Sequence, residues 1–510
     1  SLFSSSALSG APDLFWGDLD GENAPLPSPS APEPLVIPQT AFHLTGPRGL
    51  ATTWKDRARD NIAAMRLLRV IEAEDRNASP DEQSVLSRYL GFGASALANS
   101  LFPRAGEAYR EGWEDIGKAL EDTSTEAERA SLARATQYAH FTPDVIVNAL
   151  WDMLMARGFQ GGSVLEPGCG AGQFIARRPQ RLEGRIAFTG IERDSITARI
   201  ARILFPKQWI RQEDFTKASL AEGYDLALGN PPFSNRTVSV PEHRDLRGFS
   251  LHDWFIARAI SALRPGGFAA FVTSRHTLDK SDPRARERIA EEADLLGAVR
   301  LPATTMRAEA GTDVVLDVLV FRKRVLGDMP GDQTWLETAC VPDSDEGQGP
   351  LRINRFLLEN PTQVLGRHGW DSTAFGRDYS CLPVEGIVVE TALPQALARI
   401  APDSRFLPPM AQPITRSERD GPHVGTAASG ADLKEGSYCL HDRVLHQIVG
   451  GQRRIVPIRK GEQKDGLFQK HARIIEALIP IRDAARTVLR AQMDSTYIAH
   501  AVGSGSPQRD

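Results

Sequence analysis

A short run in the middle of the chain combines an amide, two prolines and an aromatic ring. It reads NPPF at 230–233 and follows the apolar stretch YDLALG. Two successive prolines fix the backbone and remove two N–H donors. The side-chain oxygen of Asn230 and the carbonyl of Pro231 are therefore rigid hydrogen-bond acceptors. Pro232 stiffens the turn, and Phe233 offers a face for stacking.

This combination suits the activation of a weakly nucleophilic amine. The lone pair of an exocyclic nucleobase amine, like that of an amide nitrogen, is delocalised. Two acceptors that bind its N–H groups draw the nitrogen towards tetrahedral geometry, and a rigid backbone supplies the preorganisation. The ring of Phe233 can stack on a base that has been extruded from a duplex. Taken alone, the run is also compatible with a rigid turn that has no chemistry.

A glycine-rich turn lies upstream, in VLEPGCGAGQF at 164–174. The pattern indicates a strand, a turn and the start of a helix. Gly168, Gly170 and Gly172 allow the backbone to approach a ligand closely. The helix N-terminus then offers free N–H groups to an anionic group such as a carboxylate. A plain strand-to-helix connection is the alternative.

Acidic residues follow the glycine turn at two points. Glu192 ends the apolar run IAFTGIE, where nucleoside-binding α/β folds place a carboxylate for ribose hydroxyls. Asp214 and Phe215, in QEDF, could hold an adenine amino group and cover its ring. Each is weak alone, because an acid at a strand end is often only a surface residue.

In this order the motifs resemble the S-adenosylmethionine-dependent N6-adenine DNA methyltransferases of the γ arrangement. HFTPDVIVNALWDML at 140–154 resembles the FTP-type element of that family. Further stretches, such as RYLGFG at 88–93 and TSRHTLDK at 273–280, resemble the methyltransferase part of large bacterial, plasmid and phage proteins that often also carry a helicase. No GxxxxGK[ST] loop is present, so we expect the helicase to be absent from this chain.

The resemblance implies a role for each matching residue. S-adenosylmethionine is the expected cofactor, and its methionine part is expected to contact Phe141, Thr142, Pro143, Glu166, Pro167, Gly168, Gly170, Gly172 and Phe174. Glu192 is expected to bind its ribose, and Asp214 and Phe215 are expected to bind its adenine. The NPPF residues are expected to hold the target adenine. Its amine would then displace the methyl group directly from the sulfonium sulfur, in a reaction that needs no metal. Because Asn230 is an amide and no base, the proton is expected to leave to water.

The implied partner is double-stranded DNA. The net charge of −5 argues against a uniformly basic coat but leaves room for a local basic groove. Candidate phosphate contacts are Arg236, Arg244 and Arg247, in the polar segment after NPPF, and Arg275 and Lys280, after the predicted strand at 268–274. Surface solubility is the alternative for each of these cations.

Strand–helix alternation between about 138 and 323 predicts the elements that position these residues. Short apolar runs occur at 163–167, 186–192, 224–229, 268–274, 295–301 and 314–321. The alternation predicts an α/β fold with a mostly parallel sheet and helices on both faces. The resemblance makes this a Rossmann-like, seven-stranded methyltransferase core. We expect a Pro/Ser-rich flexible arm at 1–45, a helical region at 46–130, the catalytic domain at 131–325 and an α+β target-recognition, DNA- or partner-binding region at 326–510.

Composition limits the other classes. The 510 residues are 41% hydrophobic and 25% charged, as in soluble globular proteins, and no apolar run reaches membrane-spanning length. Four dispersed cysteines predict reduced thiols and no zinc site. We expect a cytoplasmic protein of a bacterial or phage-infected cell. The first residue is Ser1, so we expect processing or a longer parent product.

The predicted function is N6-adenine methylation of DNA in restriction-like defence, phage defence or phage or plasmid self-protection. Two alternatives stay open. One is a methyltransferase that acts on protein glutamine or on RNA, since NPP motifs serve both. The other is a non-catalytic cofactor-binding subunit of a defence or phage assembly. The apolar positions of the final helical stretch, 471–493, could dock a helicase or another subunit, or pack on their own domain.

Overall fold

The computed structural model describes residues 42–104, 106–136, 141–234, 236–342, 344, 349–373, 376–402, 404–406, 437–441, 444–449, 452–459 and 467–493. The chain divides into residues 1–39 and residues 40–510. The expected arm at 1–45 therefore lies almost wholly outside the described residues.

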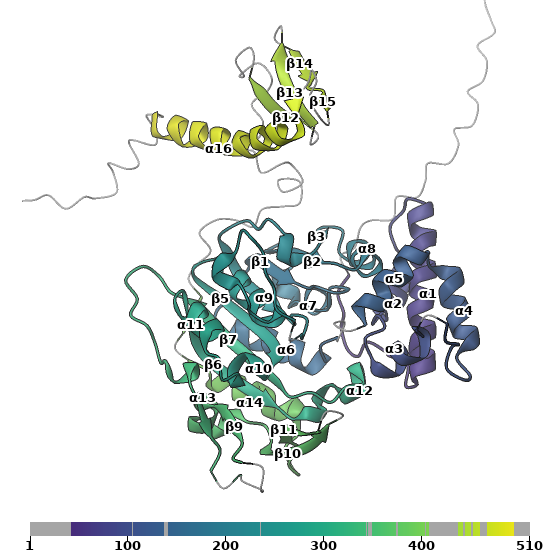
Figure 1. The fold of residues 1–510 in the computed structure, drawn as a ribbon, viewed down its shortest axis with the longest axis vertical. Coiled ribbons are helices and arrows are strands. Elements are labelled where there is room, and N and C mark those ends of the chain that lie inside the picture. Colours follow the sequence, from purple (N-terminus) through teal and green to yellow (C-terminus); the bar gives the residue numbers. More distant parts are fainter. Residues whose placement is uncertain are drawn as a thin grey trace, which may run out of the picture. The chain divides into compact units, whose positions relative to one another are not determined.

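Helices form the N-terminal part of the described chain (Figure 1). They are α1 (Trp54–Ala73), α2 (Pro80–Ser87), α3 (Ser95–Leu101), α4 (Glu114–Thr123) and α5 (Glu126–Ala135). The N-terminus of α2, at SPDE, carries a capping box: the side chain of Ser79 accepts from the backbone N–H of Glu82, whose side chain accepts from the backbone N–H of Ser79. The predicted N-terminal helical region is confirmed.

Seven strands form the central sheet, in the order β3-β2-β1-β4-β5-β7-β6. They are β1 (Gly162–Pro167), β2 (Ile186–Glu192), β3 (Trp209–Gln212), β4 (Tyr224–Gly229), β5 (Leu263–Ser274), β6 (Ala293–Leu301) and β7 (Leu316–Lys323). Every pairing is parallel except those of β7, which runs antiparallel to β5 and β6. The predicted Rossmann-like methyltransferase fold is confirmed.

Alternating side chains of the central strands enter two separate hydrophobic cores. Val164 and Leu226 point into one core, with α6 (Asp144–Ala156), α7 (Gln173–Ala176), α8 (Ser195–Leu204) and α14 (Val389–Arg399). Leu165 and Ala227 point into the other, with α9 (Leu251–Ser261) and α11 (Arg284–Ala290). Helices thus cover both faces of the sheet, as the apolar runs predicted.

One boundary differs from the sequence pattern. In the sequence, the Pro265-Gly266-Gly267 motif predicts that the helical stretch from residue 251 ends there, but α9 ends at Ser261 and these residues belong to β5. The pairing of β5 with β4 shifts register at this point. A Cβ on Gly267 would lie 2.9 Å from the carbonyl oxygen of Arg264, so the chain is too tightly folded here for a side chain. The Pro-Gly-Gly motif therefore marks an irregular strand start and no helix end.

Residues beyond the sheet form further small elements. They are η5 (Thr334–Leu336), β8 (Thr338–Cys340), β9 (Arg352–Asn354), α13 (Arg355–Glu359), η6 (Pro361–Gln363) and the hairpin of β10 (Arg367–Thr373) and β11 (Gly376–Leu382). Trp335, Leu357 and Leu397 enter the two cores of the sheet, so much of 334–400 packs on the central sheet.

The last described part is built from five short strands and one helix. These are β12 (Tyr438–His441), β13 (Val444–Val449), β14 (Gln452–Ile455), β15 (Ile458–Arg459), β16 (Leu467–Phe468) and α16 (Gln469–Met493). Leu445, Ala472 and Ile479 form a small core of their own, so α16 packs on these strands. None of the helices described in the structure has both the length and the apolarity to cross a membrane.

Candidate active site

The glycine turn and the NPPF run lie side by side at the carboxyl edge of the sheet. β1 leads into the glycine turn and β4 leads into NPPF, and these two strands are paired neighbours. The strand order reverses between them, since β2 and β3 lie on one side and β5 to β7 on the other. Open α/β sheets bind ligands in the crevice at such a switch point.

The glycine turn lies close to two of the other predicted motifs and to the loop after α8. A Cβ on Gly168 would lie 3.7 Å from Cδ of Pro232, and one on Gly170 would lie 3.7 Å from Cε1 of Phe141. Gly172 has a φ of +83°, and a Cβ there would lie 2.4 Å from the ring of Phe205 in the loop after α8. The turn thus meets both NPPF and the FTP element, and it leaves no room for a side chain at 172.

The FTP element leads directly into α6, whose first residue is Asp144. Thr142 and Pro143 are buried, and Phe141 is half-buried against the glycine turn. Asp144 accepts hydrogen bonds from Gln173, at 2.6 Å, and from Arg177, both near α7. These contacts fix the FTP element to the helix that follows the glycine turn. Phe174, in the same helix, is buried.

Two carboxylates, Glu166 and Glu192, lie at the carboxyl ends of β1 and β2 beside the glycine turn. Glu166 is 2% exposed, and its Oε2 has no hydrogen-bond partner among the described residues. Burial, with the nearby charge of Glu192, raises its pKa well above the usual range. Glu192 accepts from the backbone N–H of Gly170 at 3.0 Å and of Asp194 at 2.7 Å. Burial raises the pKa of Glu192 to about 7 in spite of these bonds.

Asp214 and Phe215 lie just beyond β3, at the start of η2 (Phe215–Lys217). Asp214 is half-buried, and its Oδ1 accepts from the backbone N–H and the hydroxyl of Thr216, at 3.0 and 2.7 Å. Phe215 is 3% exposed, and its ring centroid lies 4.6 Å from that of Phe255. Its ring therefore packs in the core behind the site, which leaves little of it to cover a base.

NPPF continues from β4, whose last residue, Gly229, has a φ of +146°. A Cβ at Gly229 would lie 3.5 Å from Cγ of Glu166, so the start of NPPF abuts the carboxylate at the end of β1. Pro231 is buried, whereas Asn230 and Phe233 are half-buried. The run therefore places an amide and an aromatic ring on a backbone that is held by the buried Pro231.

These residues fit a nucleoside sulfonium cofactor. A Cβ at Gly168, Gly170 or Gly229 would fill space beside the motifs, so the glycines form a cradle. Oε2 of Glu166 is a buried polar atom without a hydrogen-bond partner among the described residues, which a polar group of the cofactor would supply. The carboxylate of Glu192 lies at the end of β2, where ribose hydroxyls bind in folds of this kind.

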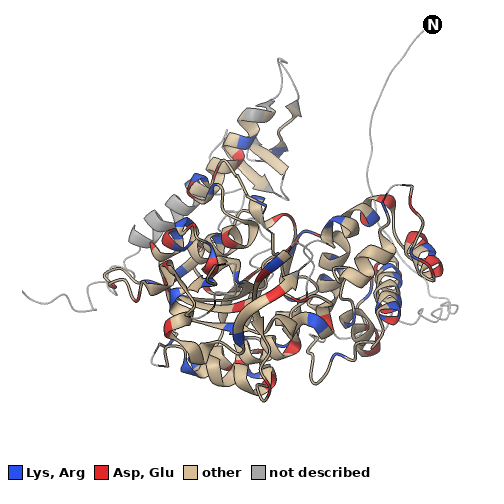
Figure 2. Ribbon diagram, turned by 60° about the horizontal axis from the view of Figure 1, so that its bottom comes forward, with Lys and Arg blue, Asp and Glu red and all other residues tan. Residues whose placement is uncertain are grey.

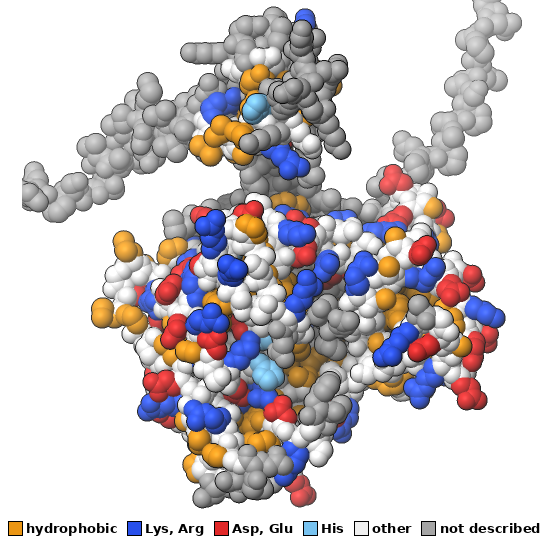
Figure 3. All heavy atoms as spheres, viewed as in Figure 1, with side chains coloured by type: hydrophobic (Ala, Val, Ile, Leu, Met, Phe, Trp, Pro, Cys, Tyr) orange, Lys and Arg blue, Asp and Glu red, His pale blue; other side chains and the backbone are white. Residues whose placement is uncertain are grey.

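Three of the predicted DNA-contacting cations are exposed. Arg236, Arg244 and Arg247 lie in the segment after NPPF, and none forms an ion pair with another residue that the structure describes. The segment is closed by the bridge between Thr237 and Ser250. Figures 2 and 3 show Lys and Arg interspersed with Asp and Glu over the molecule in the views drawn.

The other two predicted cations are held by carboxylates of the chain itself. Arg275 binds both oxygens of Asp378, at 2.8 and 2.7 Å, from the β10–β11 hairpin. Lys280 lies 2.8 Å from Oδ2 of the buried Asp253. Because each charge is already paired, the geometry gives no support to a phosphate contact by either residue.

The sequence did not predict one polar cluster beside NPPF. Ser250, His252 and Asp253, at the start of α9, are all buried, and they lie near Lys280. The only signal was three polar residues in SLHD, a pattern that also suits an ordinary helix N-terminus. Within the described part of the chain, no group of His, Cys, Asp or Glu is arranged to hold a metal ion. Cys169 is buried, and burial raises the pKa of its thiol well above the usual range.

Comparisons with known proteins find similarity over part of the chain. No model of a protein family matches it. The defense against restriction protein B of Escherichia phage P1 is 29% identical over 192 residues, which are 36% of this chain and 8% of that protein. The type II methyltransferase M.CvrRI of Paramecium bursaria Chlorella virus XZ-6E is 34% identical over 122 residues, which are 23% of this chain and 31% of that protein.

The chain thus spans less than a third of the length of these curated relatives. Among solved structures, the methyltransferase subunit of a type I restriction–modification system from Streptococcus thermophilus is 14% identical, with a TM-score of 0.32, over 52% of this chain and 66% of that one. The predicted resemblance to methyltransferases of restriction–modification systems is confirmed by the sequence matches.

Proposed function

We propose that the chain transfers a methyl group from S-adenosylmethionine to the N6 amine of adenine in double-stranded DNA. The observation that carries this proposal is the contact between the two central motifs. Gly168 of the glycine turn lies against Pro232 of NPPF, at the switch point of the sheet. A cofactor held by the first motif and an amine held by the second would therefore meet in one crevice.

One set of residues at this site binds the cofactor, and the NPPF run binds the target base. Thr142 and the glycine turn hold the methionine part, with Glu166 as a buried acceptor. Glu192 binds the ribose hydroxyls, and Asp214 binds the adenine of the cofactor. When bound, S-adenosylmethionine supplies a methyl group on a sulfonium sulfur, which is open to direct displacement.

The NPPF run prepares the target amine. The side-chain oxygen of Asn230 and the carbonyl of Pro231 accept its two N–H groups, which localises the lone pair on nitrogen. Phe233 stacks on the extruded base, and the backbone stays fixed because both prolines are held by packing. Since Asn230 is no base, the nitrogen gives one proton to water. Arg236, Arg244 and Arg247 supply phosphate contacts next to the pocket.

The names of the relatives support a proposal for the biological role. One relative is named for defence against restriction and another as a type II methyltransferase. These names support a role in a restriction-like or phage-defence system, or in phage or plasmid self-protection. A helicase or another subunit, fused or separate, is the expected protein partner, and the cytoplasm of a bacterial or phage-infected cell is the expected location.

Labelled S-adenosylmethionine tests the substrate class. The purified chain is incubated with unmethylated DNA, with RNA and with a protein extract in separate reactions. We expect label in DNA alone. Label in RNA or in protein glutamine would replace the DNA assignment by one of the two related amine substrates. If no substrate is labelled but calorimetric titration shows that the chain still binds S-adenosylhomocysteine, the result would indicate the non-catalytic cofactor-binding alternative.

A further inference from the structure

A chain of hydrogen bonds joins the N-terminal helical region to the glycine turn. The hydroxyl of Ser131, in α5, donates to Oδ2 of Asp194 at 2.8 Å. The backbone N–H of Asp194 donates to Oε1 of Glu192 at 2.7 Å, and Oε2 of Glu192 accepts from the backbone N–H of Gly170 at 3.0 Å. Ser131 and Asp194 lie 63 positions apart in the sequence, so only the folded chain brings them together.

The side chain of Asp194 is held at both of its oxygens. It is 5% exposed, and its Oδ1 accepts from the backbone N–H and the hydroxyl of Thr197, at 2.9 and 2.7 Å, which caps the N-terminus of α8. Among the residues that the structure describes, the Ser131 hydroxyl is the one donor to Oδ2, and no cation forms an ion pair with this carboxylate. A buried carboxylate without a counter-ion depends on such hydrogen bonds. Removal of the Ser131 hydroxyl would therefore leave one side of Asp194 free to turn.

The helix that carries Ser131 is seated firmly against α8 (Figure 1). Leu132, the next residue of α5, is 2% exposed and enters the hydrophobic core that α8 also lines. Arg199, in α8, binds Glu128 of α5 at 2.8 Å and the carboxylate of Glu72 in α1. The Ser131 hydroxyl is thus supplied by a fixed helix, so its hydrogen bond transmits the position of that helix to Asp194.

The position of Asp194 in turn affects how Glu192 meets a ligand. Each oxygen of Glu192 accepts one backbone N–H and keeps a further lone pair for a donor from outside the chain. Two neighbouring hydroxyls bind a carboxylate well only when its plane is already set. The backbone N–H of Asp194 fixes that plane at Oε1. A carboxylate that is oriented before binding loses little conformational freedom on binding, and its affinity for the ligand is higher.

We propose that Ser131 and Asp194 are positioning residues that orient Glu192 towards the ribose hydroxyls of the cofactor, so that the N-terminal helical region completes the cofactor site. This inference rests on the proposed function, since that function assigns the ribose to Glu192. Ser131 acts through Asp194 and Glu192. Its removal should therefore weaken cofactor binding only as far as Glu192 takes part in it.

A double-mutant cycle on the full chain tests this coupling. Calorimetric titration gives the dissociation constant of S-adenosylhomocysteine for the unmodified chain, Ser131→Ala, Glu192→Ala and the double variant, at pH 8 and below the melting temperature of each. We expect Ser131→Ala to raise the dissociation constant about fivefold in the unmodified chain and less than about twofold in the Glu192→Ala background. The same loss in both backgrounds would overturn the proposal, and so would unchanged affinity in Ser131→Ala.

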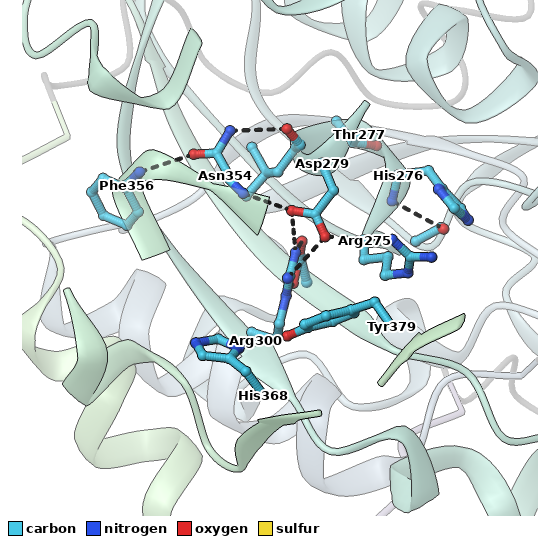
Figure 4. Close-up of polar contacts among 12 residues, drawn as sticks. Arg275, His276, Thr277, Asp279, Arg300, Asn354, Phe356, His368 and Tyr379 are labelled. Carbon is cyan, nitrogen blue, oxygen red and sulfur yellow. Dashed lines mark hydrogen bonds and ion pairs between the residues drawn. The ribbon is translucent and has the colours of Figure 1, made fainter. Parts of the chain in front are cut away.

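Two control variants separate this coupling from general stability. Arg199→Met removes another tie between α5 and α8, one that does not lead to Glu192. Arg300→Met breaks a buried network on β6, at the opposite edge of the sheet from β3, where Arg300 binds Asp279 at 2.9 Å and Asp279 accepts from the backbone N–H of Asn354 (Figure 4). We expect both variants to melt at a lower temperature and to bind S-adenosylhomocysteine within about twofold of the unmodified chain. A fivefold loss of affinity in either control would make the effect one of stability and would overturn the proposal.

A ligand analogue tests the same coupling without a change at Glu192. The 2′,3′-dideoxy analogue of S-adenosylhomocysteine has no ribose hydroxyls for Glu192 to bind. We therefore expect Ser131→Ala and the unmodified chain to bind this analogue within about twofold of one another. A fivefold difference with the analogue would show that Ser131 acts by another route and would refute the proposal.

Hydrogen exchange without any ligand separates this inference from the proposed function. We expect the amides of Asp194 and Gly170 to exchange faster in Ser131→Ala, because their acceptor Glu192 is held less firmly. If Glu192→Ala binds S-adenosylhomocysteine as tightly as the unmodified chain does, the ribose assignment of the proposed function fails. The exchange result then still decides whether Ser131 holds the backbone at Asp194. Unchanged exchange of the Asp194 amide would refute the positioning role.

Discussion

If Glu192 binds the ribose of the cofactor as proposed, we expect cofactor binding to depend on pH near neutrality. Burial raises the pKa of this carboxyl to about 7, above its ordinary value of 4.5. Ribose hydroxyls donate hydrogen bonds to the ionised carboxylate. A chain in which Glu192 is protonated must therefore lose that proton when the cofactor binds. The apparent dissociation constant should then rise by about tenfold for each pH unit below 7, and only slightly above it. Between pH 8 and pH 6 we expect affinity to fall about tenfold.

Calorimetric titration with S-adenosylhomocysteine at pH 8, 7 and 6 measures this effect. The control is Glu192→Gln, which keeps an oxygen acceptor for the N–H of Gly170 but has no proton to gain. We expect its affinity to be weaker at pH 8 and nearly constant down to pH 6. Equal affinity of the unmodified chain at pH 8 and pH 6, or the same pH dependence in Glu192→Gln, would refute the assignment of the ribose to this carboxylate.

Further predictions concern the fold around the site. Gly172→Ala places a Cβ 2.4 Å from a phenyl ring at a φ of +83°, and we expect a loss of about 3 kcal/mol of unfolding free energy in urea titration. Burial lowers the pKa of His276 to about 4, so the folded state resists its protonation. The free energy of unfolding should therefore fall as the pH drops below 6.5, by about 2 kcal/mol at pH 5. We expect this pH-dependent loss to be absent in His276→Gln. Arg300→Met leaves Asp279 and Asp317 buried without their partner, and we expect a loss of about 3–5 kcal/mol, visible as a lower urea midpoint. If Gly172→Ala or Arg300→Met lowers the free energy of unfolding by less than about 1 kcal/mol, the result would contradict the packing described.

The core strands could be predicted from the sequence because each is an apolar run whose two faces are both buried. β3 was missed, since WIRQ is short and only Ile210 in it is buried. The end of α9 was misplaced because a Pro-Gly-Gly motif fits a helix stop and an irregular strand start equally well. Local pattern therefore gave the order of the core elements and not all of their bounds.

The candidate site was predictable where motifs follow strands directly. Neighbouring strands bring Gly168 and Pro232 together, and that follows from the sheet order. The burial of Phe215 did not follow, because its aromatic partners come from α9 and meet it only in the folded chain. The pairing of Arg275 with Asp378 spans 103 positions in the sequence, which no local pattern reveals.

The identity of the methylated nucleoside tests the central claim most directly. DNA without prior methylation is incubated with the chain and S-adenosylmethionine, digested to nucleosides and separated by chromatography with mass detection. The account predicts N6-methyladenosine in its deoxy form with the unmodified chain, and none with Asn230→Ala, although that variant still binds S-adenosylhomocysteine. A methylated cytosine in its place, or N6-methyladenine that persists in Asn230→Ala, would contradict the role given to the NPPF run.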